Sequence, residues 1–520
     1  MKNLLSSTAV VAACLLGAQA QAETAITVNA IQVFGTIDPA KINDYTEYMA
    51  AVNLYDGLTT VDSAGAIVPQ LAASWEVSDD NLTYTFHLAE NATFTDGSAI
   101  EASDVVYSFQ RMLALNEGPS FLFADLVAPD AVQAVDASTV SITLSKVYAP
   151  FLTTTPLILV LNEEAVKAAS DEEWGEDVIA EQTFGAGPYS VANWNRGSEL
   201  ILGRNTSYYA GFEGGEGAPI DTVRFVITND EATARALATS GELSFSSPSH
   251  ANETYAAMDA LDNYNVNVIP TVTNLYLKLN TQAAPTDDVH VRRAIQYATD
   301  YALIREELYP SGDLNGPMAN AFADALNTDL PAPEYNLEKA AEELAMSSYA
   351  GQDITLSIAY VAGLSFEEDI ALLLQANLDA IGVTLEIQPE PWNRITERAS
   401  NPETTPNITE IFSGPTYPSP DSVFYVQYHS KSAGTWASME WLENPEIDAL
   451  IDAARSTTDV DEQNAIYKDL QADLIETASA VYIGTQQKRI AIHQCLTGYE
   501  FIPMQSWDYN FGDMRWSCED

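Results

Sequence analysis

Basic residues are scarce in this sequence. Its 520 residues include 22 Lys and Arg against 74 Asp and Glu, which gives a formal net charge of −52 at pH 7. Nucleic acids and anionic membranes bind proteins through Lys and Arg, so this excess of carboxylates excludes them as partners. Such an acidic surface is typical of halophilic proteins, and attraction of cationic ligands is a second use of the charge.

Cysteine is also scarce, with three residues in the chain. Cys14 falls in the N-terminal leader described next, which leaves Cys495 and Cys518 in the mature protein. In an oxidising compartment this pair is expected to form a disulfide that holds the C-terminal tail. Two separate thiols are the alternative.

Long apolar runs are absent after the N-terminus. Lys2 precedes an apolar run from Leu4 to Leu16, shorter than the roughly 20 residues of a membrane-spanning helix. Small residues at alternating positions then end at Ala22, which predicts a signal peptide over residues 1–22 and a periplasmic mature protein. A lipoprotein box at Val11–Cys14 is the competing interpretation.

Catalytic motifs are lacking. The chain has no G-x-S-x-G elbow, no H-E-x-x-H motif and no Gly-Lys pair of a phosphate-binding loop. Its five histidines stand far apart in the sequence, which argues against a closed zinc site. We therefore expect no enzymatic activity, no metal and no cofactor.

Alternating strand and helix patterns predict a mixed α/β fold. Residues 354–360 alternate apolar and polar side chains, residues 370–381 carry one apolar helical face, and residues 383–387 alternate again. This order predicts two parallel strands joined by a helix, with Gly382 ending the helix.

Further elements are predicted on both sides of this unit. Asn444 followed by Pro445 announces a helix, and a second amphipathic helix runs through residues 466–474. Residues 82–88 and 141–144 are expected to be strands around a helix at residues 102–113, capped by Ser103 or Asp104.

Several blocks, in order along the chain, resemble the bacterial extracellular solute-binding proteins of family 5, which include oligopeptide, dipeptide and nickel receptors. The resemblance covers most of residues 23–505 and is carried by these segments: Pro69–Ser78, Leu82–Phe86, Asn91–Gly97, Ala102–Phe109, Gly185–Tyr189, Leu275–Thr281, Val291–Asp300, Trp392, Asn444–Ile447 and Gly498. His87 departs from the family pattern, which usually has Lys or Arg there, and is expected on a strand surface.

The resemblance implies a two-lobed type II periplasmic binding protein fold with an additional inserted α+β domain. Lobe I would comprise residues 23–66, 182–270 and 488–520, the inserted domain residues 67–181, and lobe II residues 271–487. It also implies a monomeric substrate-binding subunit of an ABC importer, which captures peptide-like or other small polar solutes by lobe closure and meets permease subunits. An oligosaccharide or opine receptor, a sensory receptor and an exported hydrolase are the alternatives.

Aromatic and polar side chains are the candidates for lining the cleft between such lobes, and core packing is the alternative for each of them. Tyr417 and Trp436 stand out because they fall in a loop rich in Pro, Ser and Gly. The full set of candidates is Tyr45, Tyr48, Asn274, Tyr276, Trp392, Tyr417, Asp421 and Trp436.

One departure from the family bears on the ligand. Peptide-binding members carry an aspartate that pairs with the ligand's α-ammonium group, and here that position falls at Pro415 or Thr416. Asp421 could replace it from a shifted loop, or could instead cap a helix. Ordinary peptides are therefore expected to bind weakly unless Asp421 or another acid reaches the site.

The charge makes a prediction about stability. A net charge of −52 opposes compaction through self-repulsion, which added ions screen. The melting temperature should therefore rise from low to molar sodium chloride, as measured by circular dichroism. A flat or falling trend would mean that the charges are already balanced locally.

Overall fold

A computed structural model of the chain describes residues 23–32, 34–42, 44–212, 215–318 and 320–518. The predicted leader, residues 1–22, lies outside them. None of the helices among the described residues combines the length and the apolar character that crossing a membrane requires.

Two strand systems occupy the N-terminal part of the chain. A mixed sheet has the order β1 (Ala25–Ala30), β11 (Thr222–Ile227), β9 (Glu199–Arg204) and β8 (Tyr189–Asn195), with β1 parallel to β11. An antiparallel sheet has the order β4 (Ala72–Val77), β5 (Thr83–Leu88), β7 (Thr139–Thr143) and β6 (Val132–Asp136).

Two small sheets accompany them. A short hairpin joins β2 (Thr59–Val61) to β3 (Ile67–Pro69). The C-terminal tail contributes β18 (Leu496–Thr497) and β19 (Arg515–Trp516), which pair with each other while β19 also pairs with β10 (Ala218–Pro219).

The largest sheet has six strands. Their order is β13 (Ser311–Gly312), β17 (Ala480–His493), β12 (Tyr264–Leu279), β16 (Ile408–Ser413), β14 (Ile354–Val361) and β15 (Val383–Glu390). Strands β14, β15 and β16 are parallel, whereas β12 runs antiparallel to both β16 and β17.

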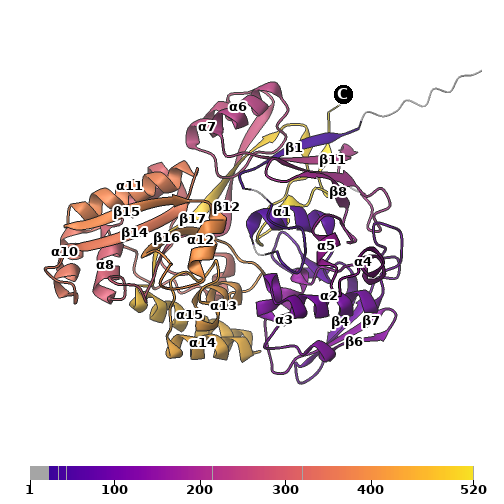
Figure 1. The fold of residues 1–520 in the computed structure, drawn as a ribbon, viewed down its shortest axis with the longest axis horizontal. Coiled ribbons are helices and arrows are strands. Elements are labelled where there is room, and N and C mark those ends of the chain that lie inside the picture. The colour runs from indigo at the N-terminus through magenta and orange to yellow at the C-terminus, as the bar shows by residue number, and fades with distance from the viewer. Residues whose placement is uncertain (1–22, 33, 43, 213–214, 319, 519–520) are drawn as a thin grey trace, which may run out of the picture.

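Helices cover these sheets (Figure 1). Those before β12 are α1 (Tyr45–Leu54), α2 (Ala102–Leu115), α3 (Phe151–Thr154), α4 (Glu163–Ala169), α5 (Glu176–Ile179), α6 (Glu231–Ser240) and α7 (Asn252–Asp259). Those after it are α8 (Val289–Ala298), α9 (Tyr301–Leu303), α10 (Leu337–Met346), α11 (Ser365–Asp379), α12 (Trp392–Ala399), α13 (Asp421–Tyr428), α14 (Pro445–Ser456) and α15 (Val460–Thr477).

Single helical turns complete the secondary structure. They are η1 (Gly118–Leu122), η2 (Pro129–Ala131), η3 (Thr155–Leu157), η4 (Ile304–Leu308), η5 (Asn320–Ala325), η6 (Ser430–Ser432) and η7 (Trp507–Tyr509).

The long strands β12 and β17 connect the two ends of the molecule. In Figure 1 they run from the sheet that carries β14 and β16 toward α6 and α7. Their pairing is interrupted between Pro270 and Asn274, so residues 271–273 leave the ladder. The far end of β17 joins the N-terminal sheet through Phe245, which bridges to both Ile492 and Val28.

The strand–helix–strand prediction is confirmed by β14, α11 and β15. The two strands pair in parallel, with Ile354 opposite Val383, and the apolar face of α11 is buried on them. Gly382, with a φ of 80°, turns the chain between α11 and β15. The predicted helices at 444–454 and 466–474 are α14 and α15, and the Asn444 side chain caps α14.

The α+β elements predicted between residues 82 and 144 are present as β5, α2 and β7. The predicted cap of α2 is wrong. The capping residue is Glu101, and Asp104 lies one turn in, where its Oδ2 atom accepts a hydrogen bond from the Glu101 backbone N–H at 2.8 Å. This reciprocal arrangement satisfies two backbone donors at the start of the helix.

A buried ion pair ties α2 to the N-terminal segment. The guanidinium of Arg111 donates two hydrogen bonds of 2.6 Å to the carboxylate of Asp38, and its Nε atom donates to the Trp174 carbonyl at 2.7 Å. The Arg111 side chain is fully buried. Removing one partner would leave the other as an unpaired buried charge, which is strongly destabilising.

Replacing Arg111 by Ala should therefore lower the free energy of unfolding by about 3–5 kcal/mol, measured by urea denaturation. Arg196→Ala is the matched control, because Arg196 pairs with Glu181 on the surface. Exposed pairs contribute about 0–1 kcal/mol, so the control should unfold nearly like the wild type. Equal effects of both substitutions would contradict the role assigned to the buried pair.

The predicted disulfide is present. Cys495 and Cys518 are bonded, with 23 residues of sequence separation and 5.2 Å between their Cα atoms. The bond joins β18 to the segment just after β19, so it closes the C-terminal tail on itself. Closing such a loop stabilises a protein by roughly 2–4 kcal/mol, mainly by restricting the unfolded chain.

The mature protein should accordingly show no free thiol when it is titrated under denaturing, non-reducing conditions. After reduction the titration should find two, and the melting temperature should fall. Two free thiols before reduction would refute the bond.

Candidate functional site

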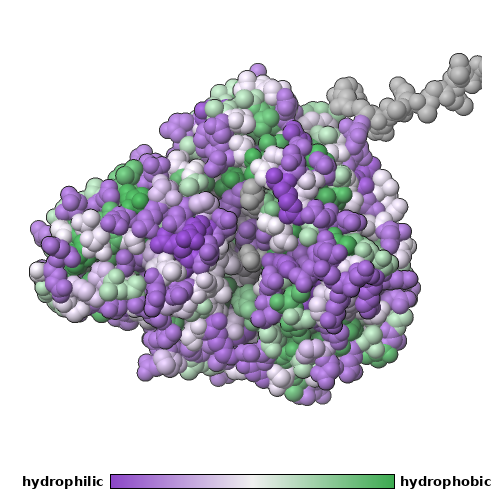
Figure 2. Space-filling model, in the orientation of Figure 1, coloured by the Kyte–Doolittle hydropathy of each residue, from purple (hydrophilic) through white to green (hydrophobic). Residues whose placement is uncertain are grey.

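A cleft that opens to solvent lies between the N-terminal and C-terminal parts of the molecule. The surface is hollowed at the centre of Figure 2, with hydrophilic residues on both sides. The cleft is lined by Ile31, Gln32, Asp44–Thr46, Pro248, Ser249, Thr271–Thr273, Val361, Glu367, Trp392, Glu410–Pro415, Trp436, Gln486, Lys488, Phe501, Met504–Ser506 and Asp508.

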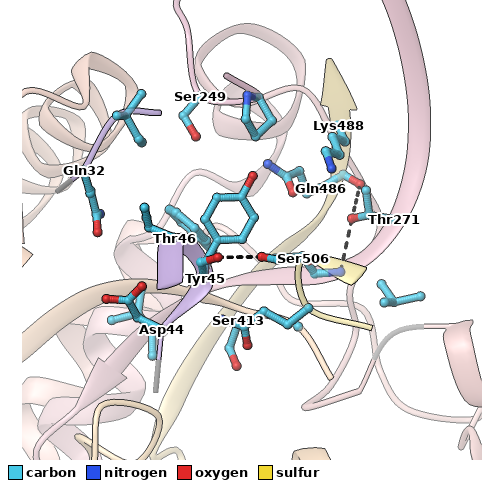
Figure 3. A pocket seen from close by; sticks show the side chains of 18 of the residues that line it. Gln32, Asp44, Tyr45, Thr46, Ser249, Thr271, Ser413, Gln486, Lys488 and Ser506 are labelled. Atoms are coloured by element: carbon cyan, nitrogen blue, oxygen red, sulfur yellow. Dashed lines mark hydrogen bonds between the residues drawn. The ribbon is translucent and has the colours of Figure 1, made fainter. Parts of the chain in front are cut away.

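The crossing strands contribute one side of the cleft. Residues 271–273, which leave the β12–β17 ladder, line it together with Gln486 and Lys488 of β17. The Thr271 hydroxyl donates a 2.9 Å hydrogen bond to the Gln486 carbonyl. In Figure 3, Thr271, Gln486 and Lys488 lie on one side of Tyr45, and Gln32 and Asp44 lie on the other.

Aromatic side chains form two walls. Tyr45 begins α1, and its hydroxyl lies 2.5 Å from that of Tyr509, which holds the phenol ring in place. Across the cleft, Trp392 at the start of α12 meets Trp436 edge to face, with ring centroids 6.4 Å apart. Both indoles are half-buried, so they retain exposed faces on which a ligand can stack.

The only cation among the described lining residues is already paired. The Lys488 ammonium contacts the Asp508 carboxylate, and both side chains are buried. The Tyr499 hydroxyl also donates to Asp508, at 2.6 Å. This pair therefore leaves little net charge to attract an anionic ligand.

Two further acids lie in the cleft wall without a cation. Glu367 stands in the first turn of α11, where its Oε2 atom accepts a 2.7 Å hydrogen bond from the Val361 backbone N–H. Glu410 projects from β16, and neither of its carboxyl oxygens has a hydrogen-bond partner among the described residues. Both side chains are fully buried.

Burial sets the protonation of these acids. It raises the pKa of Glu367 to about 8, because the surroundings cannot solvate the carboxylate. Burial, together with repulsion from Glu367, raises the pKa of Glu410 well above its ordinary value. Burial also raises the pKa of Asp44, whose side chain caps α1. At neutral pH the carboxyl of Glu367 in the empty cleft is therefore largely protonated, unlike that of an exposed glutamate.

Three of the predicted site residues come together in the cleft. Tyr45, Trp392 and Trp436 all line it, although they come from distant parts of the chain. Trp436 lies in the loop between η6 and α14, the kind of segment from which its role was predicted. Ligand contact by these three remains a prediction.

Three other candidates do not line the cleft. Tyr48 is on the buried side of α1 and packs against Trp507, with ring centroids 5.5 Å apart. Asn274 and Tyr276 are also buried, and the Asn274 amide donates a 2.7 Å hydrogen bond to the Tyr276 hydroxyl. Internal packing accounts for all three positions.

Tyr417 and Asp421 belong to a buried polar cluster outside the cleft. Asp421 accepts hydrogen bonds from the hydroxyls of Tyr148 at 2.7 Å and Tyr417 at 2.9 Å, and lies 3.3 Å from Arg455 Nε. All of its interactions are internal to α13 and its neighbours, so it does not replace the missing family aspartate. Nor does it cap α13, where Pro420 holds the cap position.

The sequence reasoning missed Glu367 and Glu410. The available signal at Glu410 was the single charged residue in the strand Ile408–Ser413. Among 74 acidic residues this signal did not stand out. Within the described part of the chain, no cluster of three or more His, Cys, Asp or Glu residues is arranged to hold a metal ion.

Known proteins share both the sequence pattern and the architecture. The model of the bacterial extracellular solute-binding proteins, family 5 Middle, matches residues 66–435. The probable D,D-dipeptide-binding periplasmic protein DdpA of Escherichia coli K12 is 26% identical over 489 residues, which cover 92% of each chain. Heme-binding protein A of Haemophilus influenzae is 28% identical over 512 residues and covers 90% of each chain.

A solved structure extends the likeness to three dimensions. The periplasmic binding protein DppA from Helicobacter pylori, in complex with the peptide STSA, superposes with a TM-score of 0.84 at 21% identity. The match covers 95% of this chain and 98% of that one. The predicted type II periplasmic binding protein fold is therefore confirmed. Since the family model matches well over half of its residues, the chain belongs to the bacterial extracellular solute-binding proteins of family 5.

Proposed function

We propose that the protein is the substrate-binding subunit of an ABC importer and captures peptide-like solutes in the periplasm. The observation that carries this proposal is the cleft itself, which combines two half-buried indoles, a fixed tyrosine and a few polar groups. The peptide-binding relatives DdpA and DppA support the ligand class. Absence of catalysis, a monomeric state and contact with permease subunits are part of the same proposal.

Closure of two lobes would enclose the ligand. We assign lobe I to residues 23–66, 182–270 and 488–520, the inserted domain to 67–181 and lobe II to 271–487. The interruption of the β12–β17 ladder after Pro270 supports a hinge at this division, because unpaired residues can absorb a change of backbone angle. Tyr45 would then approach Trp392 and Trp436 from the opposite lobe.

The buried acids bear on the choice between peptides and other solutes. The position expected for the ammonium-binding aspartate is Pro415 or Thr416, but Glu410 and Glu367 place carboxyl groups in the same cleft. A peptide-like ligand therefore has acidic partners available, which favours this class over neutral oligosaccharides.

Replacing Trp436 by Ala should weaken ligand binding roughly tenfold, because a stacking contact of about 1–2 kcal/mol is lost. Calorimetric titration with a mixture of di- to pentapeptides measures the effect, and closure should also change tryptophan emission. Trp194→Ala is the control, since Trp194 lies in β8 under Arg196 and does not line the cleft.

The control should bind like the wild type. If an oligosaccharide mixture binds to the wild type and the peptide mixture does not, the proposed ligand class is wrong. If Trp436→Ala and Trp194→Ala weaken binding equally, the assignment of the cleft is wrong.

A further inference from the structure

We propose that Glu367 and Glu410 form a seat for a positively charged nitrogen group of the ligand, an ammonium or a guanidinium. The proposal rests on the function proposed above and specifies the chemistry that the cleft selects.

The two acids occupy the boundary between the cleft and the apolar interior of the six-stranded sheet. Residues 408, 410 and 412 project from the same face of β16, because side chains alternate along a strand. Ile408 on that face belongs to the apolar cluster under α8 and α11, whereas Phe412 is partly exposed and lines the cleft. Glu410 stands between them, and Glu367 reaches the same place from the first turn of α11.

Unsatisfied hydrogen-bonding capacity indicates that this place receives a ligand. Both oxygens of Glu410 and the Oε1 atom of Glu367 lack partners among the described residues, although both side chains are fully buried. Buried polar atoms are nearly always hydrogen-bonded, and each exception requires a reason. Here the two residues that carry these three atoms line the cleft, so a donor carried by the solute supplies the missing bonds.

The ligand's donor must also be positive. The two carboxyls interact strongly enough for Glu367 to raise the pKa of Glu410, so they do not ionise together in the empty cleft. A cation placed between them would stabilise the charged form of one or both. An ionised carboxylate also forms a stronger hydrogen bond with a cationic donor than with a neutral hydroxyl or amide, so the seat discriminates in favour of ammonium and guanidinium groups.

The other titratable groups around the seat do not supply that cation. Lys488 is already paired with Asp508, and the remaining groups are an acid and three phenols. The groups that face the pair or share its cleft are Asp44, Tyr45, Tyr309, Tyr360, Lys488 and Asp508.

Binding should therefore release a proton. In the empty protein the pKa of Glu367 is about 8, so the carboxyl is largely protonated below that pH. A bound cation lowers this pKa and displaces the proton to solvent. Affinity for a cation should consequently rise with pH, by up to tenfold per unit, as the pH approaches the pKa of Glu367 at about 8.

The experiment uses five probes and calorimetry in two buffers with different ionisation enthalpies. The probes are free trialanine, acetyl-trialanine amide, acetyl-Ala-Arg-Ala amide and acetyl-Ala-citrulline-Ala amide, with agmatine as a small non-peptide cation. Citrulline has nearly the shape of arginine without its charge. We expect the arginine probe to bind at least tenfold more tightly than the citrulline probe, with proton release at pH 7.

Glu410→Gln and Glu367→Gln should each lower the affinity for cationic probes at least tenfold and abolish proton release. Glu368→Gln is the matched control, because Glu368 is the exposed neighbour in the same turn of α11. A variant that is merely misfolded would lose binding of every probe, so melting temperatures and the citrulline probe separate folding from recognition.

The outcomes distinguish this proposal from the proposed function. If charged and neutral peptides bind equally, or if both Gln variants keep full affinity for cations, the seat does not exist but peptide capture stands. If agmatine alone binds and Glu410→Gln abolishes that binding, the seat stands and peptide capture fails. If no cationic probe binds at millimolar concentration, the seat is refuted.

Discussion

The antiparallel pairing of β12 with β17 is the constraint on which the rest of the structure depends. These two strands are the longest in the described chain, and their ladder extends from Tyr264 to Lys278 on β12. One end belongs to the six-stranded sheet and the other reaches the N-terminal sheet through Phe245. The interruption after Pro270 lets the same ladder hold both parts together and line the cleft between them, because an irregularity bends a strand without ending it.

Local patterns predicted many of the elements well. The alternation in β14 and β15 and the apolar face of α11 are set by near neighbours in sequence, so they could be found without knowing the fold. Trp436 was identified as a loop residue from the Pro, Ser and Gly residues near it in the sequence, which is also a local signal. The cap of α2 was misplaced by two or three residues, because Glu, Ser and Asp all occur near that helix start.

The site was less predictable because it is built from long-range contacts. Tyr417 and Asp421 lie in a stretch rich in Pro and Ser, which suggested exposure, yet Tyr148 and Arg455 from distant segments bury them. Glu410 differs in the opposite direction: its sequence context did not mark it as a site residue, yet it lines the cleft. Neither outcome follows from composition. Each depends on which distant segments meet around the residue.

The disulfide in the C-terminal tail affects the cleft as well as the stability of the protein. Phe501, Met504–Ser506 and Asp508 line the cleft, and all of them lie inside the loop that Cys495 and Cys518 close. Without the bond this wall would still be held by the β18–β19 and β10–β19 pairing, by the Lys488–Asp508 pair and by the Tyr45–Tyr509 contact. Reducing the bond would nevertheless remove the cross-link that closes this loop, so it would act on the cleft surface as well as on the free energy of unfolding.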